Sequence, residues 1–212
     1  RYGKNFRPAA RFLNRYGKNF RPAARFLNRY GKMRLAAENW SKPWQCLFST
    51  LLSARTRDEV TIDVCNALFK RYKSVDAIAR ANSKEVGKII KPVNFYKTKT
   101  RNIVACAKIL AHDYNGKPPH DFDKLVQLPG VGRKTANVFL SECGYDEIGV
   151  DTHVFQLTRK LGWTKNTKSE LIENDIKKMF PRRYWRKINP ALVRFGRTYR
   201  SKRKRDDVLR EI

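Results

Sequence analysis

Residues 125–151, LVQLPGVGRKTANVFLSECGYDEIGVD, contain the segment that decides the fold of this chain. Within them, residues 128–132 read LPGVG, and proline and glycine in so short a segment end one helix and turn the chain. Apolar residues at helical spacing flank this break on both sides: Phe122, Leu125 and Val126 before it, and Ala136, Leu140 and Cys143 after it. The stretch therefore predicts two amphipathic helices joined by a tight hairpin.

The glycines of the hairpin, Gly130 and Gly132, can adopt positive φ or let another backbone approach closely. The second helix is predicted to begin near Gly132, where the first N–H groups have no acceptor inside the helix and point outward. Such a cluster of amides binds anions, and phosphate above all. The sequence therefore indicates a phosphate-binding hairpin, although similar hairpins also join helices in proteins that bind no phosphate.

Lys134 lies in the first turn of the second helix, where the positive end of the helix dipole and neighbouring Arg133 disfavour its charged form. A neutral amine is a nucleophile. Asp151 follows a short connection that contains glycine, so its carboxylate can be brought back toward that amine. Beside a phosphate-binding hairpin, these groups indicate chemistry on a nucleotide sugar. The alternatives are that Lys134 is merely solvated and that Asp151 caps a helix.

The net charge is the dominant feature of the composition. A formal charge of +28 and a pI near 10.4 indicate a polyanionic partner, with nucleic acid first and an acidic membrane surface second. No apolar run is long enough to span a membrane and no secretory signal is visible, so we expect an intracellular protein, in cytoplasm and nucleoid or in a nucleus.

Cysteine and histidine give no metal-binding pattern. Cys46, Cys65, Cys106 and Cys143 stand singly among apolar neighbours, which is typical of buried thiols in a reducing compartment. The histidines at 112, 120 and 153 have no partner at metal-ligand spacing, so no metal is predicted.

Elsewhere the apolar periodicity predicts helices over residues 44–52, 60–69, 74–81, 83–90, 103–111, 154–161, 171–179 and 192–195, with a loop over 92–97. No segment shows the sustained alternation of a strand, so the predicted fold class is all-α.

The run LPGVGRKTANVFL, followed at this spacing by VDTHVF, resembles the endonuclease III family of helix-hairpin-helix (HhH-GPD) DNA glycosylases and AP lyases. The likeness extends from about Cys46 to about Gly196, through LLSARTRDEVT, VNFYKTKTRNI and RFGRTY. It implies a two-lobed fold with a central six-helix lobe over residues 41–149, the helix-hairpin-helix lying at about 121–143. Residues 21–40 and 150–212 would form the second lobe, and residues 1–20 a basic arm.

The resemblance also implies a function. The chain would excise damaged pyrimidines, oxidised ones by analogy, from double-stranded DNA, and would cleave abasic sites through a Schiff base on Lys134 with Asp151 beside it. We expect it to act as a monomer. The residues expected to contact DNA are Arg55, Phe95, Tyr96 and Lys97, the hairpin residues Leu128, Gly130, Val131, Gly132 and Arg133, and Arg197. A mismatch-specific thymine or uracil glycosylase and a non-catalytic DNA-binding module remain alternatives.

Two positions depart from the family in the regions that would enter the base stack. Relatives usually carry glutamine at the position of Arg55 and glycine at the position of Asn94. Arg55 is expected to fill the gap left by the displaced base, and Phe95 to act as an apolar wedge. The alternatives are a surface arginine in a turn and an aromatic side chain that anchors the core.

The largest departure lies near the C-terminus. Family members commonly carry four cysteines in the pattern C-x6-C-x2-C-x5-C, which hold a [4Fe–4S] cluster, whereas no cysteine follows Cys143 here. We therefore expect no cluster, and lower stability or disorder in the last ~15 residues, which would have little to fold around. Residues 182–212 carry twelve Lys or Arg against three acids and are expected to lie on DNA. A natural cluster-free branch and an altered sequence fit equally well.

The N-terminus is repetitive and basic. Residues 1–28 are two identical copies of RYGKNFRPAARFLN, and residues 1–32 hold ten Lys or Arg and no acid. Such an arm would bind phosphate backbones without reading sequence. We expect the second copy, at about 22–30, to be the more ordered, while a disordered tail fits the first equally well. An artificial duplication, an unsettled start site and a recent natural duplication all remain open.

Overall fold

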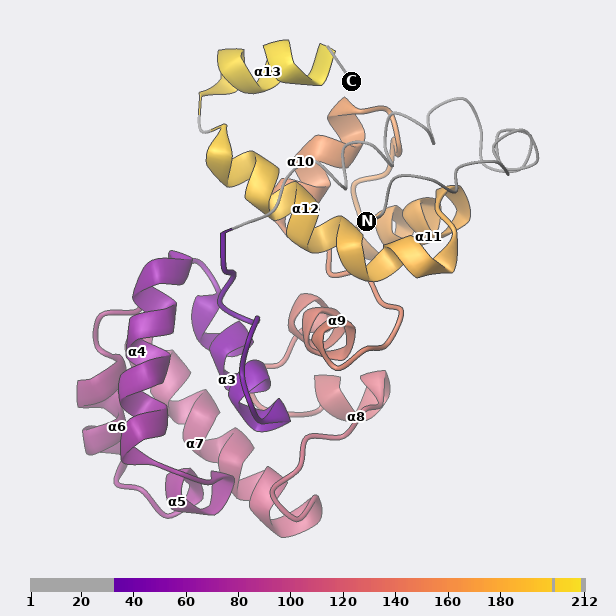
Figure 1. Cartoon of the computed structure of the whole chain (residues 1–212). Coiled ribbons are helices and arrows are strands. Elements are labelled where there is room, and N and C mark those ends of the chain that lie inside the picture. The colour runs from indigo at the N-terminus through magenta and orange to yellow at the C-terminus, as the bar shows by residue number, and fades with distance from the viewer. Residues whose placement is uncertain (1–32, 200, 211–212) are drawn as a thin grey trace, which may run out of the picture. The chain divides into compact units, whose positions relative to one another are not determined.

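The structure is a computed structural model that describes residues 33–199 and 201–210, and every regular element within them is helical (Figure 1). The elements are α3 (Pro43–Ser53), α4 (Asp58–Arg71), α5 (Val75–Ala79), α6 (Ser83–Ile90), α7 (Tyr96–Asp113), α8 (Phe122–Val126), α9 (Arg133–Glu142), α10 (Thr152–Lys160), α11 (Ser169–Met179), the 3-10 turn η1 (Arg182–Tyr184), α12 (Trp185–Thr198) and α13 (Lys202–Arg210). The predicted all-α class is confirmed. The predictions for residues 1–32 lie outside the described residues.

The chain divides into two compact units. The first unit spans residues 34–149 and holds α3 to α9, while the described part of the second unit is Met33 with residues 150–199 and 201–210. None of the described helices is long and apolar enough to cross a bilayer.

Helix α3 forms the centre of the first unit. Eight of its eleven residues are buried, because its sequence PWQCLFSTLLS is apolar on nearly every side. It consequently packs against α4, α7 and α9, which surround it in Figure 1. The rings of Trp44 and Phe69 meet edge to face with their centroids 5.0 Å apart, which joins α3 to α4.

Side chains cap the starts of α5 and α6. The Ser74 hydroxyl accepts from Ala77 N and opens α5. Helix α6 is capped by Asn82, whose Oδ1 accepts from Lys84 N at 2.8 Å, and the neighbouring Ser83 is already helical. Asparagine and serine are equally good N-caps, so composition could not decide between neighbours.

Helix α7 begins earlier than predicted. The predicted loop over residues 92–97 ends at Phe95, the N-cap, and both Tyr96 and Lys97 belong to the first helical turn. The polar run KTKT at 97–100 hid the helical face, because Lys99 and Thr100 are buried despite being polar.

The second unit is built on α10 and α12, which pack closely. A Cβ on Gly196 would lie 2.2 Å from His153 Nδ1, so only glycine lets α12 approach the first turn of α10 this closely. Residues 202–210 form α13, and an ion pair between Lys160 and Asp206 joins it to α10.

Candidate functional site

The hairpin, residues 128–132, is a hydrogen-bonded turn whose sequence dictates its shape. Val131 N donates to Leu128 O at 3.0 Å, Pro129 occupies the second position, and Gly130 occupies the third with φ 79°. Proline followed by a glycine of positive φ is the signature of a type II turn. The side chains of Leu128 and Val131 are buried and anchor the turn, so any contact they make with DNA is through their backbone.

The two exposed glycines of the hairpin serve different purposes. Gly130 needs positive φ, and a Cβ there would lie 2.7 Å from Asn102 Nδ2 and 2.9 Å from Asn102 Cβ. Gly132 has φ −92° and ψ 173°, which any residue adopts, and a Cβ there would meet nothing within 4 Å. The expectation of positive φ therefore holds for Gly130 alone, and the fold itself places no demand on Gly132.

Helix α9 starts at this open position. Gly132 is its N-cap, no side chain caps it, and its first turn contains no acid. Lys134 is half-buried in that first turn, and the guanidinium of Arg133 lies 5.0 Å from the centre of the Phe122 ring. The outward amides, the dipole and the cations together favour an anion at this end of α9.

Asp151 caps a helix in the second unit, as its alternative reading proposed. Its Oδ1 accepts from Val154 N at 2.8 Å and opens α10. A carboxylate has a second oxygen, so capping leaves acceptor capacity. Lys134 and Asp151 belong to different compact units, and each is described within its own.

Arg55 and Phe95 come together as one exposed pair, called here the Arg55–Phe95 pair. The Arg55 guanidinium lies 5.2 Å from the centre of the Phe95 ring, and the ring is 59% exposed. Phe95 is therefore not a core anchor, and the alternative reading of that residue is wrong. Tyr96, by contrast, is half-buried and packs partly against the core.

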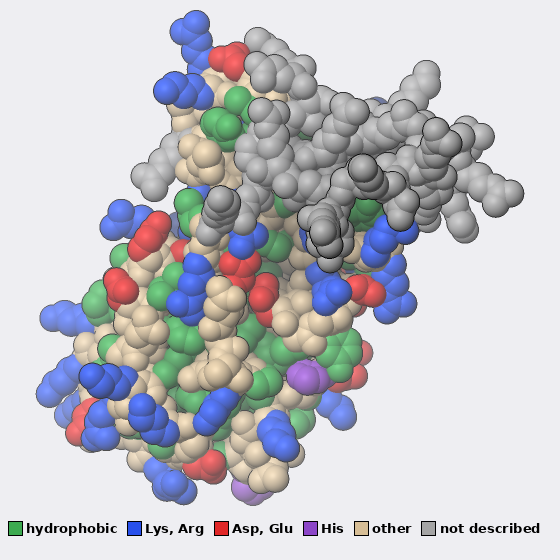
Figure 2. Space-filling view, viewed as in Figure 1, with side chains coloured by type: hydrophobic (Ala, Val, Ile, Leu, Met, Phe, Trp, Pro, Cys, Tyr) green, Lys and Arg blue, Asp and Glu red, His purple; other side chains and the backbone are tan. Residues whose placement is uncertain are grey.

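Two other predicted contact residues lie on helices α7 and α12. Lys97 is exposed in the first turn of α7, and Arg197 is half-buried in the last turn of α12, in the second unit. Figure 2 shows lysine and arginine side chains scattered over the visible face of residues 34–149, mixed with some acids. Positive charge on that face is broadly spread, which suits a long polyanion better than a compact one.

Sequence reasoning missed Lys99. It is 6% exposed, and its ammonium donates to three oxygens at the end of α3 and just after it. One signal could have found it: Lys99 shares a helical face with Ile103, Cys106 and Leu110, all buried. When a lysine falls on the apolar face of a helix, either the predicted face is wrong or the ammonium hydrogen-bonds to acceptors inside the protein.

No metal-binding group is present among the described residues, since no three His, Cys, Asp or Glu side chains gather there. The family's cluster does not fit this chain, because the residues after Tyr199 include no cysteine. The thiols of Cys46, Cys65 and Cys106 are buried, and burial raises the pKa of each. They are inert parts of the core.

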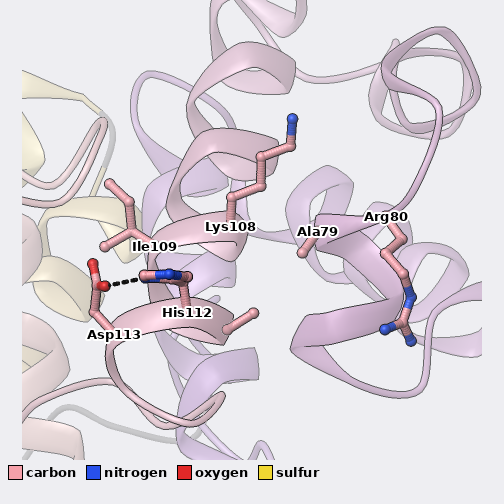
Figure 3. A pocket seen from close by; sticks show the side chains of 7 residues that line it. Ala79, Arg80, Lys108, Ile109, His112 and Asp113 are labelled. Atoms are coloured by element: carbon pink, nitrogen blue, oxygen red, sulfur yellow. Dashed lines mark hydrogen bonds and ion pairs between the residues drawn. The ribbon is translucent and has the colours of Figure 1, made fainter.

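A shallow hollow of about 610 Å³ lies between α5 and the C-terminal end of α7 (Figure 3). Lys108, His112 and Arg80 line it, and the His112 ring is bonded to the Asp113 carboxylate at 2.5 Å. That bond raises the pKa of His112. Lys99 and His112 are separated by about 20 Å along α7, so the hollow is distant from the Arg55–Phe95 pair.

Comparison with known proteins places this geometry in a family. Residues 48–182 match the HhH-GPD superfamily of base excision DNA repair proteins. Endonuclease III from Thermotoga maritima is 40% identical over 157 residues, which is 73% of each chain. Endonuclease III from Bacillus subtilis is 36% identical over 159 residues, covering 74% of this chain and 73% of the relative.

Solved structures of similar proteins agree with this family assignment. A trapped endonuclease III–DNA covalent intermediate, in an estranged-adenine complex, is 30% identical with a TM-score of 0.77, covering 86% of this chain and 84% of that one. A thermostable thymine-DNA glycosylase, 20% identical with a TM-score of 0.73 and 86% coverage of each chain, shares the fold alone.

The fold and hairpin thus define a helix-hairpin-helix DNA glycosylase of base excision repair. The chain belongs to the HhH-GPD superfamily and, within it, to the endonuclease III family. The family and the fold that the sequence predicted are confirmed.

Proposed function

We propose that this chain is a bifunctional DNA glycosylase and AP lyase that removes damaged pyrimidines, oxidised ones above all, from double-stranded DNA. The observation that carries the proposal is the place of Lys134, a half-buried amine in the first turn of α9, directly after the exposed hairpin glycines. A neutral amine at that place is a nucleophile. The covalent intermediate trapped in a solved endonuclease III–DNA structure is the kind of species such an amine would form.

DNA binding would begin at the hairpin and the cations around it. The amides at the start of α9 would hold a backbone phosphate, with Arg133 adding charge. The damaged nucleotide would leave the stack, which costs a few kcal/mol and costs least at a lesion. The Arg55–Phe95 pair is exposed and apolar on one side, so it would occupy the space that the nucleotide leaves.

The chemistry would then proceed at the sugar. Lys134 Nζ attacks C1′, the bond from C1′ to the base nitrogen breaks, and the base leaves with that electron pair and takes up a proton. The ring oxygen O4′ departs from C1′ and is protonated, which gives a protonated Schiff base between C1′ and Nζ. Loss of a C2′ proton then expels the 3′ phosphate by β-elimination, and water releases Lys134.

Asp151 is proposed to assist electrostatically. Its Oδ1 already caps α10, and the carboxylate keeps acceptor capacity on its second oxygen, with which it would stabilise the positive charge that develops on the sugar and help the amine lose its proton. The close packing of Gly196 on His153 fixes the start of α10, and therefore the place of this carboxylate within its unit.

Borohydride trapping on a duplex with one abasic site tests the proposal. Wild-type protein should form a covalent protein–DNA adduct, and Lys134→Ala should form none while keeping its melting temperature. Lys124→Ala, at an exposed lysine in α8, is the matched control and should trap normally. Folded wild-type protein that gives no adduct rules out the lyase.

Two other functions remain to be separated from this one. A non-catalytic DNA-binding module would bind the same duplex without trapping. A mismatch-specific glycosylase would release thymine or uracil opposite guanine but leave thymine glycol and 5-hydroxycytosine untouched. A panel of duplexes carrying these bases therefore decides the substrate class, with oxidised pyrimidines expected to be released fastest.

The setting of the reaction follows from the same proposal. The protein would act as a monomer on DNA inside the cell, in the nucleoid or the nucleus. With a formal charge of +28, its affinity for DNA should fall steeply as salt rises. Affinity for undamaged duplex that is unchanged between low and high salt would contradict binding through the phosphate backbone.

A further inference from the structure

Lys99 is a buried cation that the proposed reaction does not use. Its ammonium donates to Leu52 O and Ala54 O, at 2.6 Å each, and to Thr56 Oγ1 at 3.2 Å. An ammonium carries three protons, so these bonds use all of them. Two of the acceptors are carbonyls at the end of α3, the negative end of that helix.

Burial of this charge is unfavourable by itself. Desolvation lowers the pKa of Lys99 to about 8, which means that the protein interior disfavours the cation relative to water. An apolar side chain would fill the same space without that penalty. The reason for a lysine at position 99 must therefore lie in the groups that its ammonium binds.

The hydrogen bonds of Lys99 continue into the loop before α7. Thr56 Oγ1 also accepts from Asn94 N at 3.1 Å, and Asn94 Nδ2 donates to Arg55 O at 2.5 Å. The Thr56 hydroxyl thus joins the lysine to the loop.

Both ends of this network are strained. Arg55 has φ 55° and Phe95 has φ 59°, in the left-handed region that residues with a Cβ rarely adopt. Such conformations persist only where surrounding bonds hold them. Here Arg55 O is bonded to Asn94, and Phe95 directly follows Asn94. The network is therefore what keeps the guanidinium over the ring.

We propose that Lys99 is a positioning residue that holds the Arg55–Phe95 pair as one rigid element for insertion into the DNA base stack. The inference rests on the function proposed above. A pair held in place before binding loses little conformational freedom when it enters the duplex, whereas a loose loop would have to be ordered at that moment. This advantage in DNA cleavage should appear only on substrates whose base stack must be opened.

The test compares two substrates that differ in that requirement. One is an abasic site in a fully paired duplex, and the other is the same strand with the flanking bases mismatched, so that the site lies in an open bubble. The variant is Lys99→Met, which keeps the length of the side chain and removes the ammonium. Lys108→Met is the matched control, the same substitution at an exposed site on the same helix (Figure 3).

Lys99→Met should cleave the paired duplex about ten- to a hundredfold more slowly, as expected when a positioning contact is lost. On the bubble its rate should stay near wild type, because Lys134 is untouched and no stack needs opening. Lys108→Met should match wild type on both substrates. Equal losses on both substrates, or no loss on the paired duplex, would overturn the proposal.

Two further variants separate positioning from folding. Thr56→Val removes the hydroxyl that links Lys99 to Asn94 and should give the same selective loss even if Lys99→Met fails to fold. Adding Lys99→Met or Thr56→Val to Phe95→Ala should cause little further loss, since the residue being positioned is already gone. Additive losses would overturn the proposal. Wild-type protein inactive on both substrates would instead overturn the proposed function, and this inference with it.

Discussion

Alanine substitutions at the two hairpin glycines should separate an effect on folding from an effect on DNA binding. Substituting Gly130 by alanine forces a Cβ into left-handed backbone, which costs about 1–2 kcal/mol. The same Cβ would lie 2.9 Å from Asn102 Cβ, an atom fixed to the backbone of α7. Overpacking of this kind costs about 1–3 kcal/mol more. Gly130→Ala should therefore lower the free energy of unfolding by about 2–5 kcal/mol.

Gly132→Ala should behave in the opposite way. Its backbone suits alanine and its surroundings are empty, so the reduced entropy of the unfolded chain contributes about 0.4–1 kcal/mol. Alanine is a weaker N-cap than glycine, and this difference offsets roughly a few tenths of a kcal/mol of that gain. Stability should stay level or rise slightly. The new methyl group, however, would stand where a phosphate approaches, and loss of one charged hydrogen bond should weaken DNA binding by about ten- to a hundredfold.

Thermal or urea unfolding, together with binding to a duplex that carries a stable abasic-site analogue, measures both effects. Gly162→Ala is the control for backbone strain alone, because Gly162 has φ 70° and no neighbour within 4 Å. It should lose about 1 kcal/mol and bind DNA normally. The reasoning fails if Gly132→Ala binds like wild type, or if it is destabilised as much as Gly130→Ala.

Three further outcomes are expected. Phe95→Ala should change stability by less than about 1 kcal/mol, since the ring is 59% exposed, but should slow cleavage of paired duplex far more than cleavage of an open bubble. Gly196→Ala should displace His153 and the start of α10, lowering both melting temperature and excision, and unchanged values of both would refute the packing argument. The pKa of Lys99 falls from 10.5 to about 8 on folding, so the folded chain binds fewer protons between those values. This lysine should therefore make the free energy of unfolding rise with pH across that window, and urea titrations should show a shallower rise for Lys99→Met.

Much of the fold could be predicted from the sequence because it depends on residues that are neighbours along the chain. The hairpin was predictable because Pro129 fixes one dihedral and Gly130 tolerates the next, so the turn depends on adjacent residues alone. Most helices were predictable for a similar reason, since an apolar stripe of helical period must face a core.

The mistakes share a cause. The start of α7 and the partial burial of Tyr96 were missed because polar residues 97–100 conceal a helical face. Helix α13 was not predicted, and the ion pair that joins it to α10 links Lys160 to Asp206, 46 residues apart. In each case the deciding partner lies far away along the chain.

The sequence by itself determined the helical class, the hairpin, the family and the candidate nucleophile at position 134. Each of these follows from a local pattern of residues that are close together along the chain. Only the tertiary structure decided that Gly130 is required by the fold while Gly132 is not, and that the ammonium of a buried lysine binds oxygens on both sides of Arg55. Those facts depend on contacts such as Lys99 to Leu52, 47 residues apart, and no local pattern encodes which distant oxygen a buried ammonium will meet.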